Sequence, residues 1–410
     1  MVKNILVIIG IVIFGVYFYQ AIDIEEFIQS QNNDKEQQSQ RDPIQEKIHQ
    51  MTLEEKIGQM IMTGVPGTTT DEQTLHLINE FHVGGLIFFD QNLKDPSQIT
   101  QFLNQIKSEN QDNPLPLFLG VDQEGGRVQR LPVLQDIPSS QKVGEIDDEE
   151  FSYEIGRLLG KQLHAFGFNI DFAPVLDINN NPNNVVIGDR SFGSTAERVS
   201  QHGIQVMKGL QSEGITPVIK HFPGHGDTGT DSHSELPVIR KNLEELKSLE
   251  LIPFKKAIEE GADMVMAAHI LLPKIDEHNP SSLSKPIITD VLRKQLGFDG
   301  VVVTDDMTMK AITKYNDIEQ AAVQSIQAGT DLIMIAHEYD RAAKTIQAIK
   351  TAVEQGEITE ERINKSVHRI IELKQKYDLN NEPVERANIE QLNQEIEKLL
   401  STYSSLKGNN

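Results

Sequence analysis

The sequence predicts an α/β fold, a single (β/α)₈ TIM barrel preceded by an N-terminal transmembrane helix. Eight short apolar or β-branched runs alternate with longer segments of helical periodicity, which is typical of βα units around a parallel sheet. A charged or imidazole side chain follows most of these runs, and in such barrels functional groups gather where the strands end. The third observation is an apolar segment near the N-terminus, which predicts the membrane helix.

The alternation gives the position of each element. The expected strands are Met60–Thr63, Gly85–Phe89, Pro116–Val121, Ile170–Val175, Pro217–Lys220, Asp263–Ala268, Gly300–Thr304 and Asp331–Ile335. The expected helices are Tyr153–Phe166, Ala196–Gln211, Leu243–Glu259, Ile318–Ala328 and Arg341–Glu354, followed by Thr359–Tyr377 and Asn388–Ser404. Eight such units form a closed barrel more readily than an open sheet. The polar side chains at the strand ends are Asp90, Asp122, Asp177, His221, His269, Asp305 and His337.

Composition divides the chain into four segments. We expect an anchor over residues 1–22, a polar linker over 23–43, the barrel over 44–380 and a helical tail over 381–410. The linker is rich in Gln and has almost no apolar content, so it cannot bury enough surface to order itself.

The anchor consists of Lys3 followed by the apolar run Ile5–Tyr19. With its flanks, this run reaches the roughly 17–25 residues that span a bilayer. Residues 19–23 lack the small side chains of a signal-peptide cleavage site, so we expect an uncleaved, single-pass anchor in the cell membrane. Lys3 on the inner side places the barrel outside the cytoplasm. The alternative is secretion after cleavage.

The net charge and the absence of cysteine exclude several classes of function. Lys and Arg number 38 against 61 Asp and Glu, a formal charge of −23 that is repelled by phosphate backbones, so nucleic acid is excluded as a partner. Without cysteine there are no disulfides, no thiol catalysis and no Cys-ligated zinc. Any metal site would use His and carboxylates. We expect the chain to act as a monomer.

The most informative segment is Lys220–His233, which follows an expected strand and holds three His, two Asp and three Gly. Imidazole and carboxylate groups are ordinary metal ligands, which is one interpretation. In another, Asp231 orients and charges His233 for acid–base chemistry while the glycines let the loop close over a ligand. In the third, the histidines are hydrogen-bonded structural groups at the barrel rim.

Two further segments carry carboxylates to strand ends. The run Gly300–Met307 ends in Asp305 and Asp306, and since side chains alternate along a strand, we expect one to face the barrel mouth and the other to cap or brace. A carboxylate at the mouth can attack an anomeric carbon, bind a metal or cap the next helix. The segment Val121–Arg130 places an acid and two guanidinium groups around a Gly-Gly turn, although Arg127 could form a structural ion pair with Glu124.

Five segments in order resemble one known family. They are Asp122–Arg130, Asn169–Asp177, Ile187–Gly193, Lys220–His233 and Thr304–Met307. Together they are similar to the β-N-acetylglucosaminidase branch of the family 3 glycoside hydrolases, and the resemblance covers roughly Met51 to Tyr377.

The resemblance implies a site and an activity. Asp305 would be the nucleophile of a retaining exo-β-N-acetylglucosaminidase, and Asp231 and His233 a paired general acid/base. The residues implied to hold the terminal sugar are Asp122, Arg130, Arg190, Lys220 and His221. It implies no metal and no cofactor, and the expected substrates are N-acetylglucosamine-containing cell-wall saccharides derived from peptidoglycan. A His can replace the usual second carboxylate because an imidazolium held by Asp231 titrates in the physiological range.

The chain departs from the family pattern in two places. A second proline often found in the related loop is missing after Pro182, and the second α/β domain of larger members is absent from a chain of this length. Other hypotheses are a β-glucosidase of the same family, which would not need the Asp231 and His233 pair, a metallohydrolase, and a catalytically silent wall-binding module.

Overall fold

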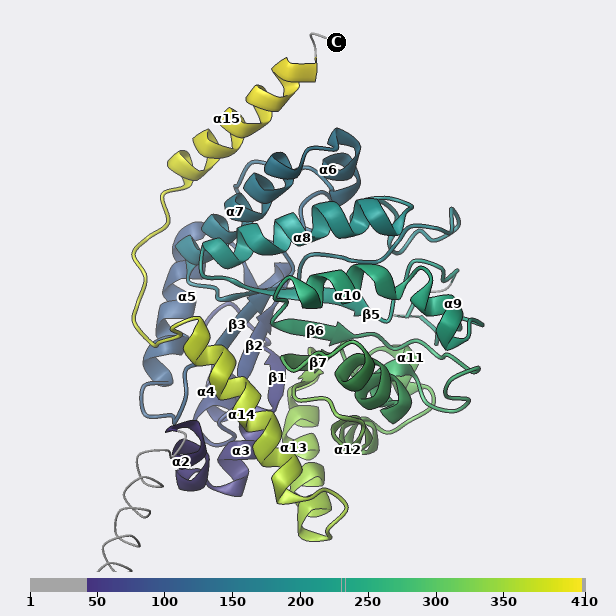
Figure 1. Ribbon diagram of the computed structural model, residues 1–410. Helices are drawn as coiled ribbons and strands as arrows, with labels where there is room; N and C mark the ends of the chain where they lie inside the picture. Colours follow the sequence, from purple (N-terminus) through teal and green to yellow (C-terminus); the bar gives the residue numbers. More distant parts are fainter. Residues whose placement is uncertain (1–42, 230, 233, 408–410) are drawn as a thin grey trace, which may run out of the picture. The chain divides into compact units, whose positions relative to one another are not determined.

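The computed structural model describes residues 43–229, 231–232 and 234–407. The chain divides into two compact units, residues 1–50 and residues 51–410. In the first unit, the described part is one short helix, α2 (Pro43–Gln50). The second unit contains the whole barrel (Figure 1).

Eight parallel strands form the barrel, in the order β7-β6-β5-β4-β3-β2-β1-β8. A parallel bridge from Val303 to Leu332 connects the two ends of this order, with the N–H of Thr304 donating to the carbonyl of Leu332 at 3.0 Å. The strands are β1 (Ile61–Gly64), β2 (Gly85–Phe88), β3 (Phe118–Val121), β4 (Ile170–Asp171), β5 (Thr216–Phe222), β6 (Met264–Ala267), β7 (Val301–Thr304) and β8 (Ile333–Ile335). The predicted (β/α)₈ barrel is confirmed.

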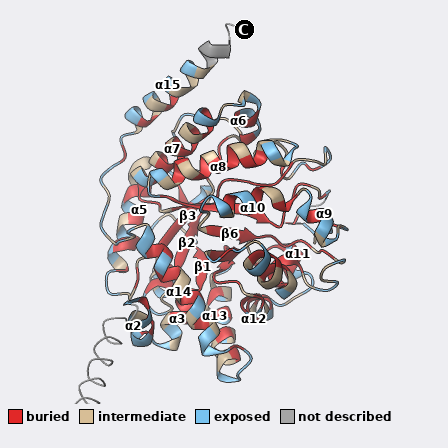
Figure 2. Ribbon diagram, viewed as in Figure 1, coloured by how far each residue is buried: buried red, intermediate tan, exposed pale blue. Residues whose placement is uncertain are grey.

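Helices follow or precede each strand and cover the outside of the barrel (Figure 1). They are α3 (Leu53–Gln59), α4 (Glu72–Asn79), α5 (Pro96–Glu109), α6 (Ser140–Ile146), α7 (Glu149–Phe166), α8 (Ala196–Ser212), α9 (Leu243–Lys247), α10 (Leu251–Glu259), a π-helical segment (Pro286–Gln295), α11 (Lys310–Thr313), α12 (Ile318–Ala328), α13 (Tyr339–Glu354), α14 (Glu360–Lys376) and α15 (Ile389–Lys407). Figure 2 shows that the strands are buried while the helices expose one side, as expected for amphipathic helices over a closed sheet.

Two of the differences from the sequence prediction occur near prolines. The fourth strand was expected to extend to Val175, but Pro174 has no N–H for the ladder, and Val175 rejoins β5 only through an isolated bridge to Lys220. The single helix expected over 243–259 is two helices, α9 and α10. Pro253 is tolerated in the first turn of α10 but would remove a hydrogen bond from a continuous helix.

The tail helix α15 packs on α7. The Nζ of Lys161 lies 2.7 Å from a carboxylate oxygen of Glu395, and the rings of Phe151 and Tyr403 have centroids 4.4 Å apart. An aromatic contact and a half-exposed ion pair therefore fix this helix to the outside of the barrel.

The predicted anchor and the linker up to residue 42 lie outside the described residues, so both stay predictions. Within the part of the chain that the structure describes, no helix has the length and apolar character needed to cross a membrane.

Candidate active site

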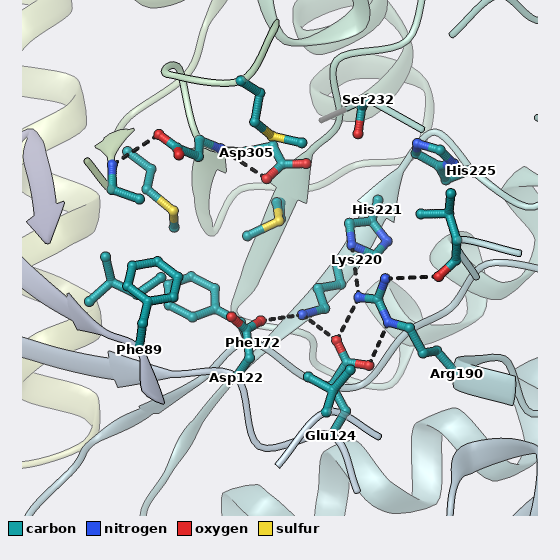
Figure 3. A pocket seen from close by; sticks show the side chains of 18 of the residues that line it. Phe89, Asp122, Glu124, Phe172, Arg190, Lys220, His221, His225, Ser232 and Asp305 are labelled. Carbon is teal, nitrogen blue, oxygen red and sulfur yellow. Dashed lines mark hydrogen bonds and ion pairs between the residues drawn. The ribbon is translucent and has the colours of Figure 1, made fainter. Parts of the chain in front are cut away.

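A polar cavity of about 370 Å³ opens at the carboxyl ends of the strands. Small-molecule sites typically enclose about 300–1,000 Å³, so this cavity suits one ring-sized ligand and not a long polymer. Part of its lining is apolar, with Phe172, Met266 and Met334 among the contributors. The charged and imidazole groups in the lining are Asp122, Glu124, Arg130, Arg190, Lys220, His221, His225, Asp305, Asp306, Lys310 and His337, most of them labelled in Figure 3.

An ionic cluster forms one side of the cavity, with Glu124 at its centre. Arg190 donates two hydrogen bonds to this carboxylate, at 2.8 Å from Nε and 2.6 Å from Nη2. The Nζ of Lys220 lies 2.6 Å from Glu124 Oε1 and 2.6 Å from Asp122 Oδ1. Glu124 is only 2% exposed, so the bidentate pair is shielded from water and rigid.

Charge complementarity within the cluster outweighs the cost of burial. Burial alone would raise the pKa of Glu124, but Arg190 and Lys220 hold that pKa well below its ordinary value. Burial would likewise lower the pKa of Lys220, yet Asp122 and Glu124 raise it overall. Glu124 and Lys220 are therefore both charged near neutral pH, and Asp122, which is 19% exposed, presents an acceptor to the cavity.

Asp177 lies behind the cavity and orients His221, near the end of β5, and His225, in the loop that follows. Its Oδ2 is 2.6 Å from Nδ1 of His221. Its Oδ1 accepts hydrogen bonds from the backbone N–H groups of His221, at 3.3 Å, and His225, at 2.6 Å. His221 thus presents Nε2 to the cavity, 3.4 Å from Nη2 of Arg190. Asp177 is a positioning residue for this edge of the site.

The consecutive carboxylates at the end of β7 have different surroundings. The Oδ1 of Asp306 accepts the backbone N–H groups of Thr308 and Ala336 at 3.0 and 2.9 Å, and its Oδ2 accepts the Thr308 hydroxyl at 2.6 Å. Asp306 therefore braces the ends of β7 and β8. Asp305 accepts the N–H of Asp306 at 2.9 Å and lines the cavity (Figure 3), where a carboxylate can reach a bound ring.

The rim combines an arginine with an aromatic pair. Arg130 Nη1 lies 3.2 Å from Asp90, a carboxylate that is 67% exposed, so this ion pair is weak and open to exchange with a ligand. The rings of Phe89 and His337 stack with centroids 5.0 Å apart and an angle of 28° between their planes. They provide a flat apolar surface beside the charged groups.

Most of the predicted site residues meet in this one cavity. The lining includes Asp305 and all five residues expected to hold a ligand, namely Asp122, Arg130, Arg190, Lys220 and His221. Asp90, Asp177 and His269, expected at strand ends, lie outside the lining. His269 is buried and contacts the Ser282 hydroxyl at 2.7 Å and the Asp306 carbonyl at 3.1 Å, so it supports the end of β7.

The loop after β5 reaches the cavity at Ser232. Its side chain is buried and lines the cavity, and its carbonyl accepts the N–H of Ala311 in α11 at 3.2 Å. Asp231 is partly exposed, and its carbonyl accepts the N–H groups of Ser234 and Glu235. His233 lies outside the described residues, so its role stays a prediction. Ser232, which stands between the two predicted acid/base residues, is thus hydrogen-bonded to α11, the helix that follows Asp305 in the chain.

Glu124 and His225 line the cavity but were not predicted as site residues. Glu124 was expected as a structural partner of Arg127, but Arg127 pairs with Asp189 at 2.8 Å and Glu124 belongs to the cluster with Arg190. His225 is one of the three histidines in the segment Lys220–His233. In the sequence, nothing distinguishes a histidine that lines a cavity from one with a structural role, because the difference lies in burial and orientation.

The metal-site interpretation of the loop finds no support within residues 43–229, 231–232 and 234–407. In these ranges, no three side chains of His, Asp or Glu come together in an arrangement that could hold a metal ion.

A (β/α)₈ barrel with a small polar cavity at its strand ends and a carboxylate facing that cavity has the architecture of a glycoside hydrolase. Residues 52–373 match the glycosyl hydrolase family 3 N terminal domain. The chain therefore belongs to this family and is a glycoside hydrolase, which confirms the resemblance found in the five sequence segments.

Relatives and solved structures agree with this assignment. The chain is 34% identical over 323 residues to a beta-hexosaminidase of Nitrosomonas eutropha, covering 76% of this chain and 91% of that protein. It is 32% identical over 334 residues to beta-hexosaminidase A of Pseudoalteromonas piscicida, covering 75% of this chain and 56% of that longer protein. The structure of a glycoside hydrolase family 3 beta-N-acetylglucosaminidase from Paenibacillus sp. superposes with a TM-score of 0.81 at 41% identity, covering 85% of this chain and 68% of the other.

Proposed function

We propose that the chain is a retaining exo-β-N-acetylglucosaminidase that removes terminal N-acetylglucosamine from peptidoglycan-derived fragments. The observation that carries the proposal is the presence of Asp305 in the same cavity as the cluster of Asp122, Glu124, Arg190 and Lys220. The cluster supplies fixed donors and acceptors for sugar hydroxyls, and Asp305 supplies a nucleophile. The names of the relatives support the choice of an N-acetylated hexosamine.

In the proposed mechanism, Asp305 attacks the anomeric carbon as the glycosidic C–O bond breaks. His233 protonates the leaving oxygen, and the sugar becomes an ester of Asp305. His233, now neutral and still oriented by Asp231, then takes a proton from water, which attacks the anomeric carbon and releases Asp305 as a carboxylate. The sugar leaves with its original anomeric configuration.

The size of the cavity supports cleavage at a chain end. About 370 Å³ suits one sugar ring, and the aromatic pair of Phe89 and His337 stands at the rim, where the next unit would emerge. Sugar rings have apolar C–H faces that pack on flat aromatic surfaces.

The first experiment is hydrolysis of an activated aryl N-acetyl-β-glucosaminide by the full chain after exhaustive chelation. We expect release of the aryl alcohol without added metal and with retention of configuration, which NMR of the initial product distinguishes from inversion. Restoration of activity by zinc would favour a metallohydrolase. Failure of the folded protein to act on any aryl glycoside, combined with binding of wall fragments, would favour a binding module.

We also propose that residues 1–22 hold the protein in the cell membrane with the barrel outside. The apolar run Ile5–Tyr19 after Lys3 supports this placement. The chain should sediment with membranes, and removal of residues 1–22 should release it. Protease added to intact cells should digest the barrel, whereas protection in intact cells would contradict the orientation.

A further inference from the structure

His225 is a buried cavity residue with one ring nitrogen that has no partner. The residue is 2% exposed and lines the cavity. Among the described residues, no group forms a hydrogen bond with its Nε2. Buried polar atoms in folded proteins are nearly always paired, so an unpaired one on a residue that lines a cavity calls for an explanation.

The contacts around His225 define which nitrogen carries the proton. The Thr228 hydroxyl donates to the His225 carbonyl at 3.0 Å, and the same oxygen lies 2.8 Å from Nδ1 of the ring. A hydroxyl has one proton, and we assign it to the bond with the carbonyl, so that Nδ1 donates to the hydroxyl oxygen and Nε2 keeps its lone pair. Burial lowers the pKa of His225, which keeps the ring neutral. Nε2 is therefore an acceptor only.

The backbone holds this ring in a fixed position. The N–H of His225 donates to Asp177 Oδ1 at 2.6 Å, and its carbonyl accepts from Asn184 Nδ2 at 2.9 Å. Figure 3 shows His225, Ser232 and Asp305 along one side of the cavity, and Asp122 and Glu124 along the other. His225 thus lies on the same side of the cavity as Asp305 (Figure 3).

We infer that His225 is a further substrate-binding residue, whose Nε2 accepts a hydrogen bond from the N–H of the 2-acetamido group. This inference rests on the proposed function. Asp305 attacks carbon 1, and the acetamido group is attached to the adjacent carbon 2. An acceptor-only nitrogen matches an amide N–H, which only donates, and the planar amide fixes the direction of that N–H. A hydroxyl at carbon 2 can rotate toward another acceptor instead.

The test compares two substitutions at one position. In His225→Asn the side-chain amide replaces Nδ1 and keeps a partner for Thr228, but nothing replaces Nε2. In His225→Gln the amide reaches the position of Nε2. We expect kcat/KM for an aryl N-acetyl-β-glucosaminide to fall roughly tenfold in His225→Asn, the size of one neutral hydrogen bond, and to recover in part in His225→Gln. For the matching aryl β-glucoside, the loss should be no more than about threefold.

Control variants separate a structural role from substrate binding. Thr228→Val removes the partner that keeps the proton on Nδ1, so it should lower the melting temperature and shift the ratio of kcat/KM for the two substrates in the same direction as His225→Asn, but by less. If His225→Asn does not fold, His225→Met takes its place in the comparison with His225→Gln. Met has a side chain of similar length to Gln but no comparable hydrogen-bond acceptor. Equal losses on both substrates would overturn the role of His225. A wild-type protein that cleaves neither substrate would instead overturn the proposed function, and this inference with it.

Discussion

Replacement of Glu124 by Gln should destabilise the protein far more than replacement of an exposed carboxylate. Glu124 is 2% exposed and contacts two cations, Arg190 through two hydrogen bonds and Lys220 at 2.6 Å. Glu124→Gln preserves the shape but leaves the two cations with only one carboxylate, Asp122, close to Lys220. Loss of one partner from a buried pair costs about 3–5 kcal/mol, and the remaining amide oxygen places this variant near 3 kcal/mol.

Asp189→Asn is the matched control. Asp189 pairs with Arg127 at 2.8 Å, but the two side chains are 41% and 48% exposed, so the loss should stay within about 1 kcal/mol. The assay is urea unfolding followed by far-UV circular dichroism, because the chain has no Trp to report on unfolding. Equal losses in the two variants would refute the view that the cluster is desolvated.

The effect of Glu124→Gln also depends on pH, with a defined sign. Arg190 and Lys220 outweigh burial and hold the pKa of Glu124 well below its ordinary value of 4.5. A lowered pKa in the folded state stabilises the protein above pH 4.5, and this contribution is lost as the pH falls further. The difference between wild type and variant should therefore be full near pH 7 and shrink below about pH 4.5. A difference that grows on acidification would contradict the assignment.

Further predictions concern the groups that position the site. Asp177→Asn should lower kcat/KM roughly 10- to 100-fold, because it removes a charged hydrogen bond of about 1.5–3 kcal/mol that orients His221; a change only in melting temperature would contradict this role. Asp306→Ala should lower the free energy of unfolding by about 2–4 kcal/mol, since the N–H groups of Thr308 and Ala336 lose their acceptor. Urea titration checks this value, and a loss below about 0.5 kcal/mol would show that these N–H groups find other partners.

Strand positions could be predicted from the sequence because β-branched apolar runs and helical periodicity are local properties. The prediction was wrong where a single proline changed the hydrogen bonding. Pro174 ended β4 early, and Pro253 divided the expected helix into α9 and α10. Both errors come from the missing N–H of proline, whose effect depends on where the chain needs a donor.

The convergence of site residues was predictable for a topological reason. Parallel strands bring their carboxyl ends to one face, so Asp122, Lys220 and Asp305 meet although they are far apart in the sequence. Pairing within the site was not predictable. Glu124 has Arg127 three residues away but pairs with Arg190. The guanidinium group of Arg127 instead contacts Asp189 and the carbonyls of the segment 185–187.

In the proposed mechanism, Asp305 becomes covalently attached to the sugar. The most direct test is mass spectrometry of the full chain after incubation with a slowly turned-over fluorinated N-acetylglucosaminyl fluoride. We expect one added glycosyl mass, located on the peptide that contains Asp305, and no added mass in the Asp305→Ala variant. An active enzyme that carries the label on another residue, or that shows no covalent species under any condition in which the inhibitor inactivates it, would contradict the account.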